Sequence, residues 1–145
     1  MSPTLQSHFA DYASHHQTAG NQLCHAVGIP LIVFSLIALL AQVGLAVVGG
    51  YTITLAHVVI VAATLYYLTL DPLLALGMLA YSTASLLLGR PLPWTVSLAL
   101  FVFGWILQFV GHSVYEKRSP AFLKNLTHLL VGPLWILAKA TRRTT

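Results

Sequence analysis

Histidine is the residue type in this sequence best suited to chemistry. Seven histidines stand among 145 residues, whereas Asp and Glu together number only three. His16 and His25 precede the first long apolar run, and His112 follows the last one. Neutral imidazole is the commonest metal ligand in proteins, and ionisable groups beside apolar spans indicate function. Three histidines, with or without one carboxylate, predict a site for iron, zinc or copper that leaves positions open for substrate and dioxygen.

The spacing near the amino terminus limits how two of these histidines can meet. Asn21 and His25 stand in an i, i+4 relation, so on a helix they share one face. On a single continuous helix, the spacing of His16 and His25 places them on opposite faces. Gly20 lies between them and is expected to break or bend the helix, so that two short elements aim both imidazoles at one point. The alternative is that these histidines are solvated at a membrane interface.

A second polar pair follows the last apolar run. His112 and Glu116 also stand in an i, i+4 relation and share a helical face. Glu116 is a candidate metal ligand or, alternatively, an acceptor for the second ring N–H of a ligating histidine. The competing interpretation pairs Glu116 with Lys117 or Arg118 at the level of the lipid headgroups.

The remaining polar candidates have simpler explanations. His57 lies near the start of an apolar run and is expected to be hydrogen-bonded in the interior. His8 and His128 are expected at the membrane interface, and His15 is expected to point away from the site. Asp71 is expected to cap the helix that follows it.

The elements that must position these residues are apolar helices. Hydrophobic residues make up 57% of the chain and charged residues 7%, whereas a soluble domain carries about 25% charged residues. Four apolar runs approach the roughly 20 residues that cross a hydrocarbon core, and Gly49-Gly50 marks the first turn between them. We therefore predict an all-α integral membrane helical bundle that forms one domain over residues 1–145, with spans at 29–48, 53–70, 73–88 and 94–110.

Polar segments flank the predicted bundle at both ends. Residues 1–27 are polar, rich in histidine and free of Lys and Arg, so a cleavable signal peptide is not expected. Residues 111–145 carry six of the seven basic residues. A helix over 121–138, interrupted by Pro133, is expected to be interfacial or re-entrant and not a further span. The net charge of +4 indicates contact with anionic lipid, and no nucleic-acid partner is expected.

An even number of spans places both termini on one side of the membrane. The basic carboxyl-terminal segment then puts that side in the cytoplasm. With this topology five candidate polar residues lie at the same membrane face, namely His15, His16, His25, His112 and Asp71.

Two motifs resemble those of a known family. The first is Tyr12-x3-His16-x4-Asn21-x3-His25-x2-Gly28-x-Pro30. The second is Gln108-Phe109-x-Gly111-His112-x3-Glu116-x-Arg118-x-Pro120-Ala121, followed by Gly132-Pro133. Both are similar to signatures of the Mpo-like family, the fungal membrane 2-hydroxy fatty acid dioxygenases of phytosphingosine breakdown and their bacterial relatives. The number of spans between the motifs also matches, so the resemblance covers nearly the whole chain.

The resemblance implies an iron(II)-dependent oxidoreductase of fatty acid α-oxidation. Its substrates would be a long-chain 2-hydroxy fatty acid and dioxygen, and cleavage between C1 and C2 would leave a fatty acid one carbon shorter. His16, His25 and His112 match the positions of metal ligands, while Asn21 and Glu116 match supporting residues of the catalytic site. The compact loops favour a bacterial inner membrane over the endoplasmic reticulum.

The alternative function is a non-enzymatic membrane scaffold or a transporter-like bundle with interfacial histidines. Transport requires polar groups near the middle of the bilayer. The predicted spans offer few polar side chains and no charged one; the polar ones are Ser35, Gln42, Thr64, Ser82 and Ser85. A haem site is disfavoured because the candidate histidines lie at the ends of the spans and not inside the bundle.

Overall fold

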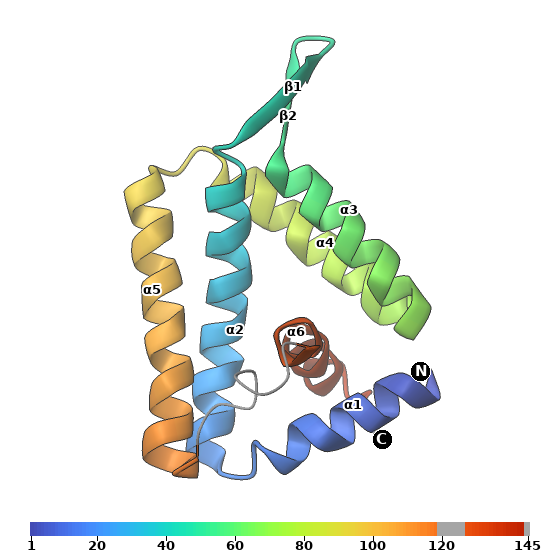
Figure 1. Ribbon diagram of the computed structural model, residues 1–145, viewed down its shortest axis with the longest axis vertical. Coiled ribbons are helices and arrows are strands. Elements are labelled where there is room, and N and C mark those ends of the chain that lie inside the picture. The colour runs from blue at the N-terminus through green and yellow to red at the C-terminus, as the bar shows by residue number, and fades with distance from the viewer. Residues whose placement is uncertain (119–126, 144–145) are drawn as a thin grey trace.

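The fold is a bundle of helices with one projecting β-hairpin (Figure 1). The computed structural model describes residues 1–118 and 127–143. Their elements are α1 Pro3–Ser14, α2 Ala19–Leu40, β1 Gly44–Val48, β2 Tyr51–Thr54, α3 Leu55–Leu70, α4 Pro72–Gly89, α5 Trp94–Val110, the π-helical turn η1 Gly111–Glu116 and α6 Thr127–Ala140.

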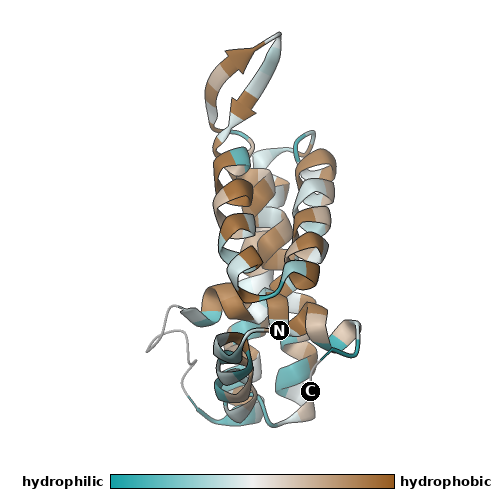
Figure 2. Ribbon diagram, turned by 90° about the vertical axis from the view of Figure 1, so that its right-hand side faces the viewer, coloured by the Kyte–Doolittle hydropathy of each residue, from teal (hydrophilic) through white to brown (hydrophobic). Residues whose placement is uncertain are grey.

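Three helices are long and apolar enough to cross a membrane: α2, α4, and α5 together with η1. Their outer faces, with that of α3, expose large apolar side chains to an extent that a soluble monomer does not show; they include Val58, Leu65, Leu76, Leu87, Leu88, Val102, Phe103 and Ile106. Figure 2 shows hydrophobic residues along the middle of the molecule and hydrophilic ones near both termini. The predicted all-α membrane bundle is confirmed, although α3, with 16 residues, is shorter than the span expected there.

The first predicted span, 29–48, extends beyond the end of its helix. The helix α2 begins at Ala19 and ends at Leu40, and the residues after it form the antiparallel hairpin β1–β2. Gly49 (φ 55°) and Gly50 (φ 80°) form the expected turn, and two positive φ angles are what a tight hairpin turn requires. In Figure 1 the hairpin projects from the end of the bundle opposite to α1.

The break between α1 and α2 lies before the glycine expected to cause it. Residues 15–18 separate the two helices, and Thr18 caps α2 by accepting a hydrogen bond from the backbone N–H of Asn21 at 3.4 Å. Gly20 lies within α2, where any Cβ atom would collide with the ring of Tyr115. Gly20 therefore permits close packing of η1 against α2.

Small residues bring α2 and α5 into contact along one seam. A Cβ atom on Gly28 would lie 2.9 Å from the carbonyl oxygen of Gly104, and one on Gly104 would lie 3.0 Å from the carbonyl oxygen of Gly28. A Cβ atom on Gly111 would lie 3.3 Å from Nδ1 of His25. Close backbone approach at small residues is the usual way in which membrane helices pack. The seam therefore sets His25 beside the start of η1.

The carboxyl-terminal helix α6 packs inside the molecule. Val131, Leu134 and Ala138 are fully buried in a core that also contains Leu5 of α1 and Leu74 of α4. With 14 residues, α6 is too short to span a bilayer. The expected helix too short to be a further span is present over Thr127–Ala140, and residues 121–126 of the predicted helix lie outside the described part.

Asp71 caps α4, as the sequence predicts. Its Oδ1 accepts the backbone N–H groups of Leu73 and Leu74 at 3.0 Å each. Its Oδ2 lies 3.1 Å from the amino group of Met1 and 3.6 Å from the guanidinium of Arg143. Burial alone would raise the pKa of Asp71, but these hydrogen bonds and positive charges outweigh it and lower that pKa. Asp71 thus ties both ends of the described chain to the α3–α4 turn.

Candidate metal centre

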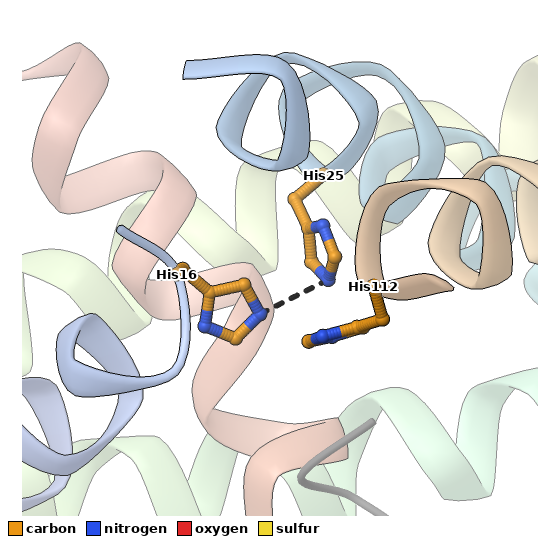
Figure 3. A group of neighbouring side chains, drawn as sticks. All are labelled: His16, His25 and His112. Atoms are coloured by element: carbon orange, nitrogen blue, oxygen red, sulfur yellow. Dashed lines mark hydrogen bonds between the residues drawn. The ribbon is translucent and has the colours of Figure 1, made fainter. Parts of the chain in front are cut away.

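Three histidines from separate elements converge at the end of the bundle that lies away from the hairpin (Figure 3). His16 follows α1, His25 lies in α2 and His112 lies in η1. All three are buried, each with 2% of its surface exposed. One ring nitrogen from each lies within 4.8 Å of the other two. These are the three histidines that the sequence analysis singled out as ligands.

The backbone fixes the protonation of two of these rings. Nδ1 of His16 lies 2.6 Å from the carbonyl oxygen of Tyr12, and Nδ1 of His25 lies 2.9 Å from that of Asn21. A carbonyl only accepts hydrogen bonds, so both Nδ1 atoms must carry the proton and donate it. In the neutral rings both Nε2 atoms are then bare lone pairs, and they lie 3.1 Å apart.

Two lone pairs at that distance repel each other unless a cation lies near both. Burial, with His112 nearby, lowers the pKa of His16 to about 4. A proton therefore does not supply the cation near neutral pH. A metal ion could supply it, because neutral imidazole Nε2 with Nδ1 bonded to a backbone carbonyl is the usual form of a ligating histidine.

Unpaired polar atoms around the cluster also fit a bound group. Among the described residues, Nδ1 of His112, Oδ1 of Asn21 and Nε2 of Gln108 are buried without a hydrogen-bond partner. Buried polar atoms are rarely left unpaired in a folded protein. Three neutral imidazoles suit iron, zinc or copper, and they leave coordination positions open. The residues present therefore fit a metal ion with open coordination positions.

Glu116 makes contacts that the sequence does not predict. Its carboxylate accepts hydrogen bonds from the backbone N–H groups of Gln17 at 3.0 Å and Thr18 at 3.1 Å. It also accepts from the hydroxyl of Thr18 at 2.9 Å and from Nδ2 of Asn21 at 3.1 Å. In the described structure its partners are thus the α1–α2 loop and the first turn of α2, and not an imidazole N–H, Lys117 or Arg118. Glu116 holds the loop that carries His16 against η1.

His128 belongs to the same site, although the sequence analysis expects it at the interface. It is buried, and its Nε2 lies 2.7 Å from Oδ2 of Asp11. Its Nδ1 is buried and has no partner in the described part of the chain. His15 stays half exposed with its ring 5.7 Å from that of His128. The contact joins residues 117 positions apart, so local spacing carries no signal for it.

The other histidines lie outside the cluster. Nε2 of His57 is hydrogen-bonded to the hydroxyl of Tyr51 at 3.1 Å. Nδ1 of His57 accepts the backbone N–H of Thr54 at 3.0 Å. It is hydrogen-bonded as predicted, but at the base of the hairpin. His8 is half-buried in α1.

Tyr12, a residue of the first motif, stacks on His16 with ring centroids 4.0 Å apart.

A cavity adjoins the three histidines, and we call it the histidine cavity. Its lining combines polar rings and an amide with aliphatic and aromatic side chains. Its lining consists of Tyr12, His16, His25, Ile29, Ile32, Val33, Trp105, Gln108, His112, His128, Leu129 and Pro133. Such a lining suits a molecule with a polar head and an apolar tail.

Comparison with known proteins identifies the family of the chain. The family model described as 2-hydroxy-palmitic acid dioxygenase Mpo1-like matches residues 2–144. The chain belongs to the Mpo1-like family. It is also 34% identical over 134 residues to the 2-hydroxy-palmitic acid dioxygenase MPO1 of Saccharomyces cerevisiae, and this alignment covers 92% of the chain and 77% of the yeast protein. No solved structure matches the chain.

The structure explains why the two motifs of this Mpo1-like protein occur together. Asn21, His25 and Gly28 of the first motif lie on the face of α2 that packs against α5 and η1. Gly111 and His112 of the second motif lie on the opposing side of the same seam. Each motif therefore supplies at least one candidate ligand. Each also supplies a small residue that lets the candidate ligands approach one another.

Proposed function

We propose that this protein is an iron(II)-dependent dioxygenase that cleaves long-chain 2-hydroxy fatty acids between C1 and C2. The atoms balance when the acid and dioxygen yield a fatty acid one carbon shorter, carbon dioxide and water. The observation that carries the proposal is the pair of bare Nε2 atoms of His16 and His25 facing each other beside His112. The family membership supports the substrate class.

His16, His25 and His112 would hold the iron. When bound, the metal supplies Lewis-acid activation and a template on which the hydroxy acid and dioxygen meet. The protein orients two of its ligands by the carbonyl groups of Tyr12 and Asn21, which keep each ring proton on Nδ1. Burial of all three rings excludes bulk water from the site.

Glu116 and Asn21 act as positioning residues in this proposal. The carboxylate of Glu116 binds the backbone of residues 17 and 18, next to His16, and it extends from the same turn as His112. It therefore sets the separation of two ligands that belong to different elements. Asn21 connects Glu116 to His25, because its side chain donates to Glu116 and its backbone carbonyl accepts from His25.

His128 supplies a proton acceptor at the wall of the histidine cavity. Oδ2 of Asp11 accepts the proton on Nε2 of His128 at 2.7 Å, which in the neutral ring leaves a lone pair at Nδ1. That Nδ1 is buried and has no partner in the described residues. It is available to accept the proton of the substrate's 2-hydroxyl group and to orient that hydroxyl.

The membrane supplies the substrate in this account. We infer that both termini face the cytoplasm, because the basic residues gather in the carboxyl-terminal segment, and that the membrane is the bacterial inner membrane. Burial of the histidine cluster argues against the alternative of a scaffold or transporter-like bundle, in which the histidines would be solvated at the interface.

A turnover assay tests the proposal. Protein purified in detergent without oxygen is loaded with iron(II) or zinc(II), and 2-hydroxypalmitate and isotopically labelled dioxygen are then added. We expect iron-loaded protein to release pentadecanoate that carries the label, and zinc-loaded protein to release none. Iron-loaded wild type that consumes no 2-hydroxy acid would contradict the proposal and favour the scaffold.

A further inference from the structure

A second cavity adjoins the histidine cavity, between α2, α4 and α6. Its lining consists of Ile29, Pro30, Val33, Met78, Tyr81, Pro133, Ile136, Leu137 and Ala140, and we call it the apolar cavity. Ile29, Val33 and Pro133 line both cavities. The two spaces are therefore adjacent, with these three residues between them.

The apolar cavity offers no polar group to a ligand. Its lining contains no charged residue, and the hydroxyl of Tyr81 is already donated to the carbonyl oxygen of Pro30 at 2.7 Å. Its volume of about 140 Å³ is close to the roughly 150 Å³ of an engineered apolar cavity that binds benzene. The matching ligand is a hydrocarbon chain.

Two prolines keep this space from closing. Pro30 lies inside α2 and Pro133 lies inside α6, and both line the apolar cavity. A proline inside a helix lacks the N–H of the helical ladder, and its ring displaces the preceding turn. The two helices therefore face each other at positions where neither presents a regular packing surface.

We propose that the apolar cavity holds the distal part of the substrate's acyl chain while the polar head lies in the histidine cavity. The proposal rests on the proposed function for the identity of the substrate. The adjacency of the two cavities selects this occupant over a two-tailed membrane lipid, because one ligand with a polar head and a single long tail fills both. The end of the apolar cavity then sets the chain length that the protein accepts.

Leu137 is the residue that should tune this length. It is half-buried, it lines the apolar cavity, and it packs against α4 at Gly77, where a Cβ atom would lie 2.8 Å from its Cδ2. Leu137→Trp shortens the cavity and Leu137→Ala lengthens it. Leu88→Trp and Leu88→Ala are matched controls on the outer face of α4, where Leu88 is 67% exposed.

The first test compares kcat/KM for 2-hydroxyoctanoate and 2-hydroxypalmitate. We expect Leu137→Trp to lower the ratio of long-chain to short-chain kcat/KM by about tenfold, as for a filled hydrophobic pocket. Leu137→Ala should move the chain-length optimum to longer acids, and both Leu88 variants should leave it in place. A general loss of folding cannot move the optimum in opposite directions. Equal losses on both substrates in the Leu137 variants would overturn the proposal.

The second test does not depend on turnover. A 2-hydroxypalmitate analogue with a photoreactive diazirine at its last carbon is irradiated with the detergent-purified wild-type protein, and the labelled peptides are mapped by mass spectrometry. Labelling of residues 77–81 and 136–140 that 2-hydroxypalmitate displaces would support the cavity, even if the protein turned over no substrate and the proposed function failed. Labelling confined to the outer faces of the helices, or equal labelling by a phosphatidylcholine probe, would overturn it.

Discussion

The two ends of the helical bundle carry histidines in opposite states. At the hairpin end, His57 is half exposed and both ring nitrogens have partners in Tyr51 and Thr54. At the other end, His16 and His25 are buried, and only Nδ1 of each has a backbone partner. The difference lies in the Nε2 atoms. Nε2 of His57 is hydrogen-bonded to Tyr51, whereas Nε2 of His16 and Nε2 of His25 face each other at the site.

The comparison shows what separates a ligand histidine from a structural one. A buried ring whose Nδ1 donates to a carbonyl keeps a bare Nε2, and that atom stays unsatisfied until a cation binds. A ring that bonds through both nitrogens to its own turn stabilises that turn and has nothing left to offer a metal. Changes at the two ends should therefore differ in kind, with function lost at one and only stability lost at the other.

The largest effect is expected from removing a ligand. His25→Ala and His112→Ala should each abolish formation of the shortened fatty acid, with losses above the roughly 100-fold that changes around metal ligands reach. The measurement is product formation by mass spectrometry on iron-loaded protein. Activity within a few-fold of wild type in either variant would contradict the assignment.

Glu116→Gln should have an intermediate effect. The amide keeps the size of the side chain, but it replaces a charged acceptor of four hydrogen bonds with a neutral group. We expect activity to fall by about 10- to 100-fold, as for residues that orient metal ligands. Arg118→Gln is the matched control, because Arg118 is exposed. Equal activities in the two variants would remove the positioning role of Glu116.

The metal-free protein should lose stability in acid because of His16. Burial lowers the pKa of His16 from 6.5 to about 4, so between these values the unfolded chain binds a proton that the folded chain does not. Stability therefore falls as the pH drops from about 6.5 to about 4, and is not affected by this group above that window. This pH dependence is measured by the midpoint of thermal unfolding of the metal-free protein, prepared with a chelator, at a series of pH values. His16→Gln should flatten the dependence, and an unchanged slope would contradict the account.

The smallest effect is expected at the hairpin end. His57→Ala removes the side chain that completes the capping box of α3 and should cost about 1 kcal/mol in free energy of unfolding. Chemical denaturation measures that cost, and product formation should stay at the wild-type level. A loss of activity comparable to that of Glu116→Gln would erase the distinction between the two ends.

The sequence predicts the class of fold and the candidate ligand set because both follow from local patterns. Apolar runs give the helices, and His16, His25 and His112 stand out as rare ionisable residues at their ends. The first span is misplaced because the apolar stretch AQVGLAVV follows α2 directly, and apolarity alone does not separate a buried helix from a short strand. The start of α2 is missed because its first turn is polar.

The role of His128 lies beyond any local pattern. Its partner Asp11 is 117 residues away in the chain, and only the packing of α6 against α1 brings them together. The contacts of Glu116 have the same origin, because they cross from η1 to the α1–α2 loop. Spacing rules describe one helix at a time, so they indicate which residues share a face and not what lies opposite.

Metal content tests the central claim most directly. Wild type and the variants His16→Ala, His25→Ala, His112→Ala and His57→Ala are purified in detergent without oxygen, supplied with iron(II), desalted and analysed by elemental mass spectrometry. The account predicts about one iron per chain in wild type and His57→Ala, and iron lost in the other three. Wild type that retains no metal, or His16, His25 and His112 variants that retain as much iron as wild type, would contradict it.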